Sequence, residues 1–555
     1  MLYRIIFLFF LIFSVSYSQR FLDLEIDDFT KNYAIELNNI GDPILLLTTL
    51  NSGNDLCIQH YSQNVREIDY FENMNQIPMD SIYSQIIFNN SYNEGGFISA
   101  LFSRPLSPNL NIKFLYNNLS SQGFYFNQKN KYSYLSLLLN YLNKNKQYSI
   151  LFKLQSTNGD YLQNGGTENY NSLLDMDLMP TNLTNAQTFI KKRNININQK
   201  YLIKSNLAIR HNMDFNYFQR DYTDSNVQSF YYSMTPLSYL IEGSYSNHCL
   251  LTRLSNSISM LNNYIEFSIN HHYYDYLESY RKYKSGDLDI SLSSNNLLKS
   301  NKIVDFNLNF CPTGYNKNNY VIDINFDKIN KFSKYNVELS YVSKKPNLFT
   351  DHYDTGYTLS WEEFQSIKVF SIFLKSKFLK YNFLISSQFK RYMNFVYFDN
   401  LASPEQHLES LLYFNLRFHK VWDFNSIVLT SDFCVQKSNN IILSVPDLLF
   451  VQKIQYHTSL SSNLNLKSSI NFSIFSKYYI QSFFPLTDVF YLQEDNKKGF
   501  YPIVSTDIFI DKKNFSVGLV IDNLTALLVN NYSFIDNYFL SPTNVRLSIR
   551  WQFLD

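Results

Sequence analysis

The last residues of the chain, NVRLSIRWQFLD (544–555), alternate between apolar and polar side chains. Because neighbouring side chains of a strand point to opposite faces, this stretch predicts a strand with one apolar face and one polar face. The polar face carries two cations, Arg546 and Arg550. The apolar face carries Val545, Leu547, Ile549, Trp551 and Phe553.

The same alternation recurs along the chain, in KIVDFNLNF (302–310), YVIDINFDK (320–328), KYNVELSY (334–341) and NLAIRHNMDFNYF (206–218). A period of two residues fits strands and fits helices poorly. The apolar faces of these segments, and of the last one, are predicted to include Val304, Phe306, Leu308, Ile322, Ile324, Leu547 and Ile549.

Two architectures use this pattern: stacked soluble sheets and a closed transmembrane barrel. In a sandwich the apolar faces meet each other, whereas in a barrel they meet lipid and the polar faces enclose water. The strands are long for a sandwich, no linker interrupts them, and the chain ends on a strand that can close a barrel. The sequence therefore predicts an all-β fold, a single large antiparallel transmembrane β-barrel of roughly 20–24 strands.

Composition agrees with this prediction. The 555 residues carry a net charge of +1, which argues against a nucleic-acid partner, and 17% are aromatic. Aromatic rings suit the interface between headgroups and hydrocarbon. We expect Trp551, Phe553, Tyr335 and Tyr341 to be interfacial anchors, because they stand at the ends of apolar faces.

The first residues, MLYRIIFLFFLIFSVSYSQR (1–20), have an early cation, a short apolar run and small residues. This is the pattern of a secretory signal peptide, predicted here to cover residues 1–18. The apolar run is shorter than the roughly 20 residues that span a bilayer, and no other run reaches that length.

The remaining chain divides into two parts. Residues 19–80 alternate weakly and supply either the first strands or a segment inserted in the lumen. Residues 81–555 are predicted to form the barrel, with 545–554 as its closing strand. The ranges 161–188, 346–363 and 522–543 are long and irregular, and they are predicted to be surface loops.

Several stretches resemble the putative porins of Bacteroidetes-type bacteria. LNNIGDPILLL (37–47) resembles an Asn-x-Gly element of that family, and YNNLSSQGFYFNQ (116–128) resembles its Ser-x-Gly-x-Tyr-x-Asn-Gln element. YLQNGGTEN (161–169) follows in the expected order. The strongest resemblance is C-terminal, in FFPLTDVFYLQEDNKKGFYPIVSTDIFI (483–510) and RLSIRWQFLD (546–555).

The resemblance implies an outer-membrane channel for passive diffusion of small solutes in a Gram-negative-type bacterium. Its implied partners are outer-membrane lipid, the barrel assembly machinery and small solutes, without a cofactor; the oligomeric state stays open. Two alternatives remain: a non-conducting structural or adhesive barrel, and a barrel transporter for hydrophobic molecules. A plugged, energy-coupled receptor is disfavoured, because residues 19–80 are short for a globular plug.

The polar faces supply candidate functional residues. Selectivity in a hydrated pore depends on its width and lining charge. The residues predicted to line the pore are Arg546, Arg550, Asp305, Asp323, Glu338, Arg210 and Asp214.

No catalytic or metal motif competes with this interpretation. His271 and His272 are adjacent, so on a strand they face opposite ways and cannot bind one metal together. Neither HExxH nor GxSxG occurs. Cys57, Cys249, Cys311 and Cys434 lie far apart, which favours unpaired packing residues over disulfides. We therefore expect no enzyme.

Overall fold

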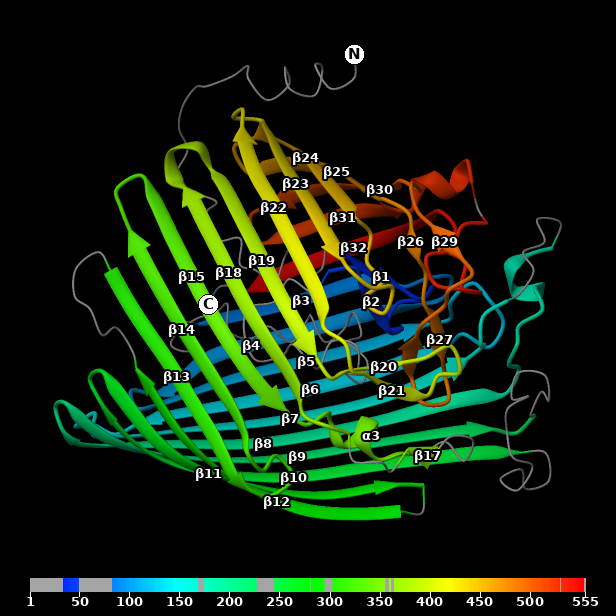
Figure 1. Ribbon diagram of the computed structural model, residues 1–555. Helices are drawn as coiled ribbons and strands as arrows, with labels where there is room; N and C mark the ends of the chain where they lie inside the picture. The colour runs from blue at the N-terminus through cyan, green and yellow to red at the C-terminus, as the bar shows by residue number, and fades with distance from the viewer. Residues whose placement is uncertain are drawn as a thin grey trace.

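The computed structural model describes residues 33–48, 82–167, 174–226, 244–279, 281–294, 302–354, 359–360, 364–529 and 531–553. Within these ranges, antiparallel strands form one closed barrel of 22 members (Figure 1). The predicted all-β barrel and its strand number are confirmed. No helix in the described ranges is both long and apolar enough to cross a bilayer.

Consecutive wall strands pair with each other around the ring. Their bounds are β3 Tyr83–Asn90, β4 Gly95–Ser107, β5 Leu110–Ser121, β6 Asn130–Leu142, β7 Tyr148–Gln163, β8 Ala186–Lys204, β9 Leu207–Asp224, β10 Tyr245–Asn262, β11 Ile265–Glu278, β12 Arg281–Ser294, β13 Lys302–Thr313, β14 Asn319–Ile329, β15 Ser333–Lys344, β18 Ile367–Phe378, β19 Phe383–Met393, β22 Leu411–Asp423, β23 Ile427–Ser438, β24 Leu448–Ser461, β25 Leu464–Phe475, β30 Ile503–Lys512, β31 Phe515–Asp522 and β32 Asn544–Phe553.

The last wall strand closes the barrel against the first. β3 pairs with β4 on one side and with β32 on the other. In the closing register Ile86 lies opposite Trp551, and Phe88 lies opposite Ile549. Closure leaves the wall without a free sheet edge, as a strand protein in hydrocarbon requires.

The apolar and polar residues that alternate in the sequence lie on the outer face and the inner face of the barrel wall, respectively. Leu308, Ile324 and Trp551 point away from the lumen and are 39%, 43% and 51% exposed. On the inner face Ser340 donates to Asp323 (2.6 Å). Since these outer apolar rows stay exposed among the residues that the structure describes, they have the chemistry of a lipid-facing surface.

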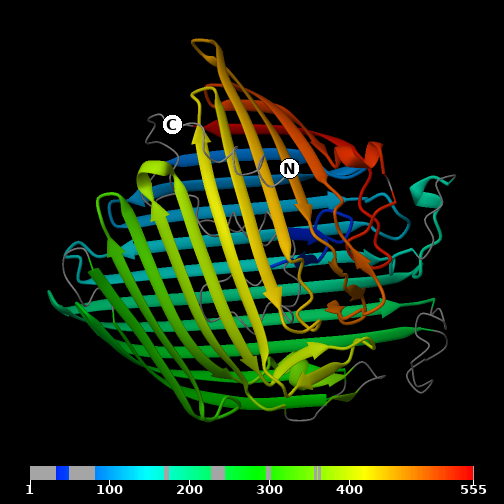
Figure 2. The same cartoon turned by 45° about the horizontal axis from the view of Figure 1, so that its top comes forward.

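The two ends of the barrel differ. At one end the connections are short: β4 stops at Ser107 before β5 starts at Leu110, and β8 stops at Lys204 before β9 starts at Leu207. Both barrel termini lie at this turn end. Most of the long connections, such as 345–366 and 476–502, lie at the other end, the loop end (Figure 2).

Short elements lie outside the wall. Their bounds are β1 Ala34–Glu36, β2 Ile44–Leu46, η3 Met176–Leu178, α3 Leu348–Asp351, β16 Tyr353–Asp354, β17 Leu359–Ser360, η5 Leu379–Tyr381, β20 Phe395–Phe398, β21 Pro404–His407, β26 Tyr478–Tyr479, β27 Ser482–Phe484, β28 Val489–Tyr491, β29 Lys497–Lys498 and η6 Leu524–Leu527.

Two of the predicted surface loops are instead partly buried. Phe349 and Tyr353, in the connection between β15 and β18, are buried, and so are Phe534 and Ile535 between β31 and β32. The surface location was predicted from the irregular sequence alone, but these connections carry apolar residues that are buried inside the barrel. The prediction of surface loops was wrong for these parts.

Candidate gate at the loop end of the barrel

A small hairpin stands inside the lumen. β1 and β2 pair with each other, Ala34 opposite Leu46, and neither pairs with a wall strand. Two three-residue strands are too few to be stable alone. Burial against the wall stabilises them, because Ile35, Leu37 and Leu47 pack in a cluster with wall residues of β18, β23, β24 and β25.

The turn of this hairpin is fixed to β5 and β6. The Asn39 side chain donates to the Gln128 carbonyl (2.7 Å), and Ser121 donates to the Asn39 side-chain oxygen (2.6 Å). Asn130 donates to the Asp42 carboxylate (2.7 Å), whose other oxygen accepts from the Asn39 backbone N–H (3.0 Å). All five side chains are buried. Buried bonds of this kind are costly to leave unmade.

The hairpin's other end is fixed to β22 and β23. Tyr33 is fully buried and donates to Asp432 (3.1 Å). The same carboxylate accepts from Arg417 Nε (2.8 Å) and lies 3.1 Å from His419 Nδ1. Burial, together with the negative charge of Asp432, raises the pKa of Tyr33 well above its usual value. The phenol therefore stays a donor, and it joins the hairpin to a buried charged group on the wall.

The hairpin also bonds the wall through its backbone. Gln436 of β23 donates to the Leu47 carbonyl (2.7 Å) and to the Pro446 carbonyl (2.8 Å). Tyr413 of β22 in turn donates to Gln436 (2.7 Å). The hairpin is thus bonded to β5 and β6 at one end and to β22 and β23 at the other, and it bridges the lumen.

A second set of contacts lies around Arg220, on the inner face of β9. Its guanidinium lies 3.6 Å from Glu278 and donates to Asn247 (2.7 Å), and all three side chains are buried. It also donates to the Thr487 carbonyl and lies 5.2 Å from the ring centre of Phe349. Arg220 therefore ties two long connections to the wall.

Three connections meet at Tyr353. Its hydroxyl donates to the Ala402 carbonyl (2.9 Å) and lies 2.9 Å from the Thr487 hydroxyl. These partners belong to the connections that follow β19 and β25. Burial raises the pKa of Tyr353 above the usual tyrosine range.

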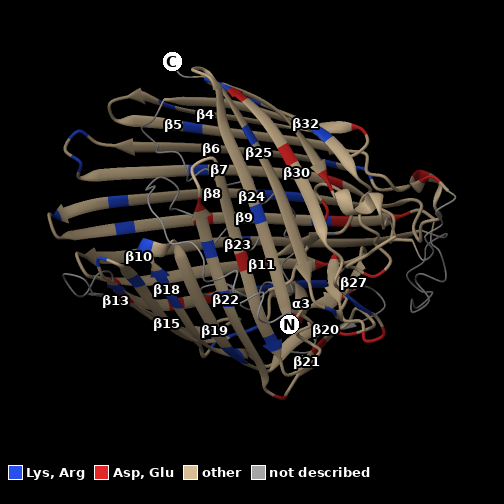
Figure 3. Cartoon of the chain, turned by 90° about the horizontal axis from the view of Figure 1, so that it is seen from above, with Lys and Arg blue, Asp and Glu red and all other residues tan. Residues whose placement is uncertain are grey.

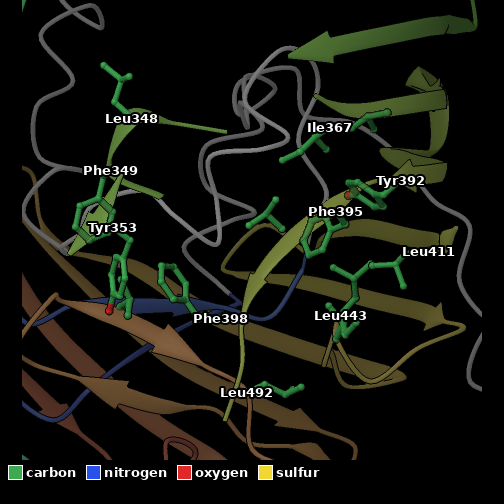
Figure 4. Packing of buried hydrophobic residues seen from close by; sticks show 14 of the residues in the cluster. Leu348, Phe349, Tyr353, Ile367, Tyr392, Phe395, Phe398, Leu411, Leu443 and Leu492 are labelled. Carbon is green, nitrogen blue, oxygen red and sulfur yellow. The ribbon is translucent and has the colours of Figure 1, made fainter. Parts of the chain in front are cut away.

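The side chains around Tyr353 form a packed apolar cluster (Figure 4). Phe349 and Tyr353 meet edge to face, 5.5 Å between ring centres, and Phe398 lies 5.3 Å from Tyr353. Asp351 accepts from Tyr315 (2.9 Å) at the border of this cluster, and burial raises its pKa. We call the hairpin (33–48) and the described parts of connections 345–366, 394–410, 439–447, 476–502 and 531–543 the luminal plug.

The NGG stretch belongs to this arrangement too. Gly165 and Gly166 both have positive φ, 66° and 78°, and a Cβ on Gly166 would stand 2.5 Å from the Asn537 carbonyl oxygen. Thr167 donates its backbone N–H to that carbonyl (2.8 Å). Glycine here allows the β7–β8 and β31–β32 connections to touch.

The residues predicted to line the pore lie on inner faces, but on separate strands. Arg210 pairs with Glu266 (2.9 Å), Asp214 lies 3.9 Å from Arg253, and Arg546 pairs with Asp522 (2.6 Å). Figure 3 shows charged positions spread over many wall strands. The remaining members of the set stand on β13, β14, β15 and β32: Asp305, Asp323, Glu338 and Arg550. The structure gathers them into no single site, and pore lining stays a prediction.

The predicted anchors lie near the rims. Trp551 packs against Phe553 with the rings tilted (4.5 Å between ring centres) and meets Phe515 edge to face (6.3 Å). These rings stand at the turn end, as does Tyr335. Tyr341 lies on the loop-end half of β15, 5.5 Å from the ring centre of Tyr320. Their role at the membrane interface stays a prediction.

The histidines and cysteines considered in the sequence form no metal-binding group in the described residues. His272 faces inward, 2.7 Å from Ser255 and 3.3 Å from Asp289, while His271 faces outward. No group of three metal-binding side chains occurs in the described part of the chain. Cys249, Cys311 and Cys434 are buried and unpaired, whereas Cys57 lies outside the described residues, as does the predicted signal peptide.

Sequence reasoning missed the plug residues Tyr33, Asn39, Asp42 and Tyr353, and the wall residue Arg220 that contacts the plug. One signal was present: LNNIGDPILLL and YNNLSSQGFYFNQ resemble elements of one family, and the structure brings them together. Gly123 shows why, because a Cβ there would stand 2.3 Å from the Gln128 amide oxygen and 3.0 Å from the Asn39 side chain. Resemblance alone did not indicate that the two elements touch.

The family model described as putative porin matches residues 16–555. The chain belongs to the putative porin family. No curated protein matches it.

Solved structures with a similar fold include receptors. The siderophore receptor PirA from Acinetobacter baumannii aligns with a TM-score of 0.61 at 11% identity, over 86% of this chain and 81% of that one. The ferric-catecholate import receptor Fiu from E. coli K12 aligns with a TM-score of 0.61 at 8% identity, over 86% of this chain and 82% of that one. A ferric enterobactin receptor mutant from Pseudomonas aeruginosa aligns with a TM-score of 0.60 at 10% identity, over 85% of this chain and 82% of that one. At this identity the porin-family chain shares with them the fold of an outer-membrane barrel.

Proposed function

We propose that this porin-family protein is a gated outer-membrane transport barrel. Small solutes cross its lumen only when the luminal plug moves aside. The observation that carries the proposal is the hairpin bonded across the lumen, from Asn39 and Asp42 at β5 and β6 to Tyr33 at Asp432. A wall of 22 strands would be wide enough for water unless something fills it. The plug fills its loop end.

Orientation follows from the connections. Outer-membrane barrels have short turns on the periplasmic side and longer loops outside. We therefore place the turn end, with both barrel termini, in the periplasm and the plug at the outer mouth. A solute arriving from outside would meet the plug first.

A permanently open passive channel is the second candidate. The polar inner faces of β13–β15 favour it, since Asn307 and Ser340 both donate to Asp323 (3.2 and 2.6 Å) and leave a hydrophilic wall. The barrel-shaped proteins above favour a transporter, because one is named as a siderophore receptor and another as a ferric-catecholate import receptor. Lining charge sets solute preference in either case.

A reversible lock tests the proposal. In a background with the native cysteines replaced by alanine, Asn39→Cys and Ser121→Cys would tie the hairpin to β5, because these side chains already touch (2.6 Å). Single-channel recording in a planar bilayer measures conductance before and after reduction. We expect no steps while the disulfide is present and steps after reduction.

The matched control is Leu308→Cys with Ile322→Cys, which join two wall strands on the outer face. This pair should leave conductance unaffected by reduction. Equal, steady conductance of the oxidised and reduced plug-locked variants would support the open channel and overturn the gate. Silence in both states would support a structural barrel.

A further inference from the structure

The rim of the barrel beyond β31 exposes an apolar surface. In η6 and the two residues after it, Leu527, Leu528 and Val529 are 72%, 87% and 44% exposed. Phe500, close before β30, is 59% exposed. Tyr501 donates to the Val529 carbonyl (3.0 Å), so these two segments are neighbours. Exposed apolar groups of this size mark contact with a partner or a membrane.

The wall beneath this rim is unusually short. β31 has eight residues, whereas a membrane-spanning strand needs about 9–11. At the usual tilt, eight residues rise about 20 Å, which falls short of an apolar band about 25 Å tall. The outward positions of β31 are apolar along its whole length: Phe515, Val517, Leu519 and Ile521. Hydrocarbon therefore reaches the loop end of this strand.

The other side of the barrel differs. β8 has 19 residues and β9 has 18. On the outer face of β11 and β12, Asp275 lies 3.3 Å from Lys282 and 3.4 Å from Lys284, and Tyr273 and Ile269 follow toward the turn end. An ion pair on the outer face marks where the apolar band stops. Here the wall rises past the band, whereas at β31 it does not.

We propose that η6 and Leu528–Val529 complete the lipid-facing band above β31 and lie in the hydrocarbon of the outer leaflet. The occupant of this surface is lipid, because the patch continues the outer row of Leu519 and Val545 and the one charged residue between, Asp522, faces inward and pairs with Arg546 (2.6 Å). In Figure 1 the patch is the red helical turn beyond β30 and β31, at the edge of the barrel. The proposal rests on the barrel spanning a membrane and is independent of the gate.

An environment-sensitive fluorophore tests it. Each of three single-cysteine variants, Leu528→Cys, Leu519→Cys and Leu178→Cys, would be labelled in the cysteine-free full chain and inserted in vesicles containing brominated phospholipid. Leu519 lies on the outer face of the wall, and Leu178 is exposed in η3 of the β7–β8 connection. We expect the label at 528 to be quenched by bromolipid as strongly as that at 519, and not by aqueous iodide.

Two results would overturn the proposal. Quenching at 528 by iodide, as at 178, would place the turn in water. Shielding from both quenchers would place it against protein, such as a second copy of the chain. The label at 519 reports whether the barrel has inserted, so a failed insertion is distinguished from a wrong placement.

Discussion

At the scale of single residues, a strand position faces either lipid or lumen, and its facing decides what a substitution does. Leu308 points outward, and Asn307 beside it donates inward to Asp323. The sequence alone predicted this facing, since the period of two residues leaves only two choices. It could not predict the partner of an inward side chain, because that partner depends on strand register.

Leu308→Arg is predicted to destabilise the barrel by about 2–4 kcal/mol if the residue is near the midplane, because the cation would enter hydrocarbon. Asn307→Arg, on the opposite face, is predicted to be tolerated. Urea unfolding in lipid vesicles, followed by tryptophan fluorescence, measures both. Equal losses would contradict the assigned facing.

Arg220→Met is predicted to weaken the plug by about 3–5 kcal/mol, because buried Glu278 loses its cation. The temperature at which the barrel loses its folded mobility on a detergent gel should fall. In the double variant Arg220→Met with Glu278→Gln the loss should be much smaller. A single variant as heat-resistant as the natural chain would show that the ion pair contributes little.

At the scale of elements, the wall strands could be predicted from the sequence and the plug could not. Segments such as 320–328 alternate because one side meets lipid, and this pattern is visible without neighbours. The β1–β2 hairpin has only three residues in each strand, so the alternation of its buried residues Ile35, Leu37, Leu45 and Leu47 is too short to be recognised in the sequence. The predicted division at residue 80 left open whether this segment was wall or insert, and the structure places the hairpin inside.

Asp42→Ala is predicted to loosen the hairpin, because the Asn39 backbone N–H loses its acceptor and Asn130 loses one of its two acceptors. The expected cost is about 1–3 kcal/mol. Limited proteolysis of the folded protein in vesicles should cut the hairpin faster. Asp175→Ala is the control, since that side chain caps η3 without a hydrogen bond. Similar cleavage of both variants would contradict the anchoring role.

At the scale of the whole molecule, closure of the ring makes the wall cooperative. The final strand pairs with β31 on one side and β3 on the other, so it joins the two ends of the sheet. The sequence predicted such closure from a strand at the very end of the chain. The sequence predicted the number of strands only as a range, because the long connections show no apolar–polar alternation that would mark where a strand ends.

A chain lacking residues 544–555 is therefore predicted not to form a closed barrel, since β3 and β31 would both become open edges in lipid. The measurement is mobility on a detergent gel with and without heating, where a closed barrel migrates differently when unheated. Trp551→Ala, which keeps the strand, should still show the shift. A shift in the truncated chain would indicate that another strand can replace β32.

The bond between Tyr33 and Asp432 joins residues 399 positions apart. An exported chain crosses the inner membrane starting with its N-terminal residues. The hairpin therefore arrives before β22 and β23, which supply its binding partners. Throughout that delay its leucines and isoleucines lack their final neighbours. We therefore expect the hairpin to reach its final position only after β22 and β23 have formed, late in the folding of the barrel.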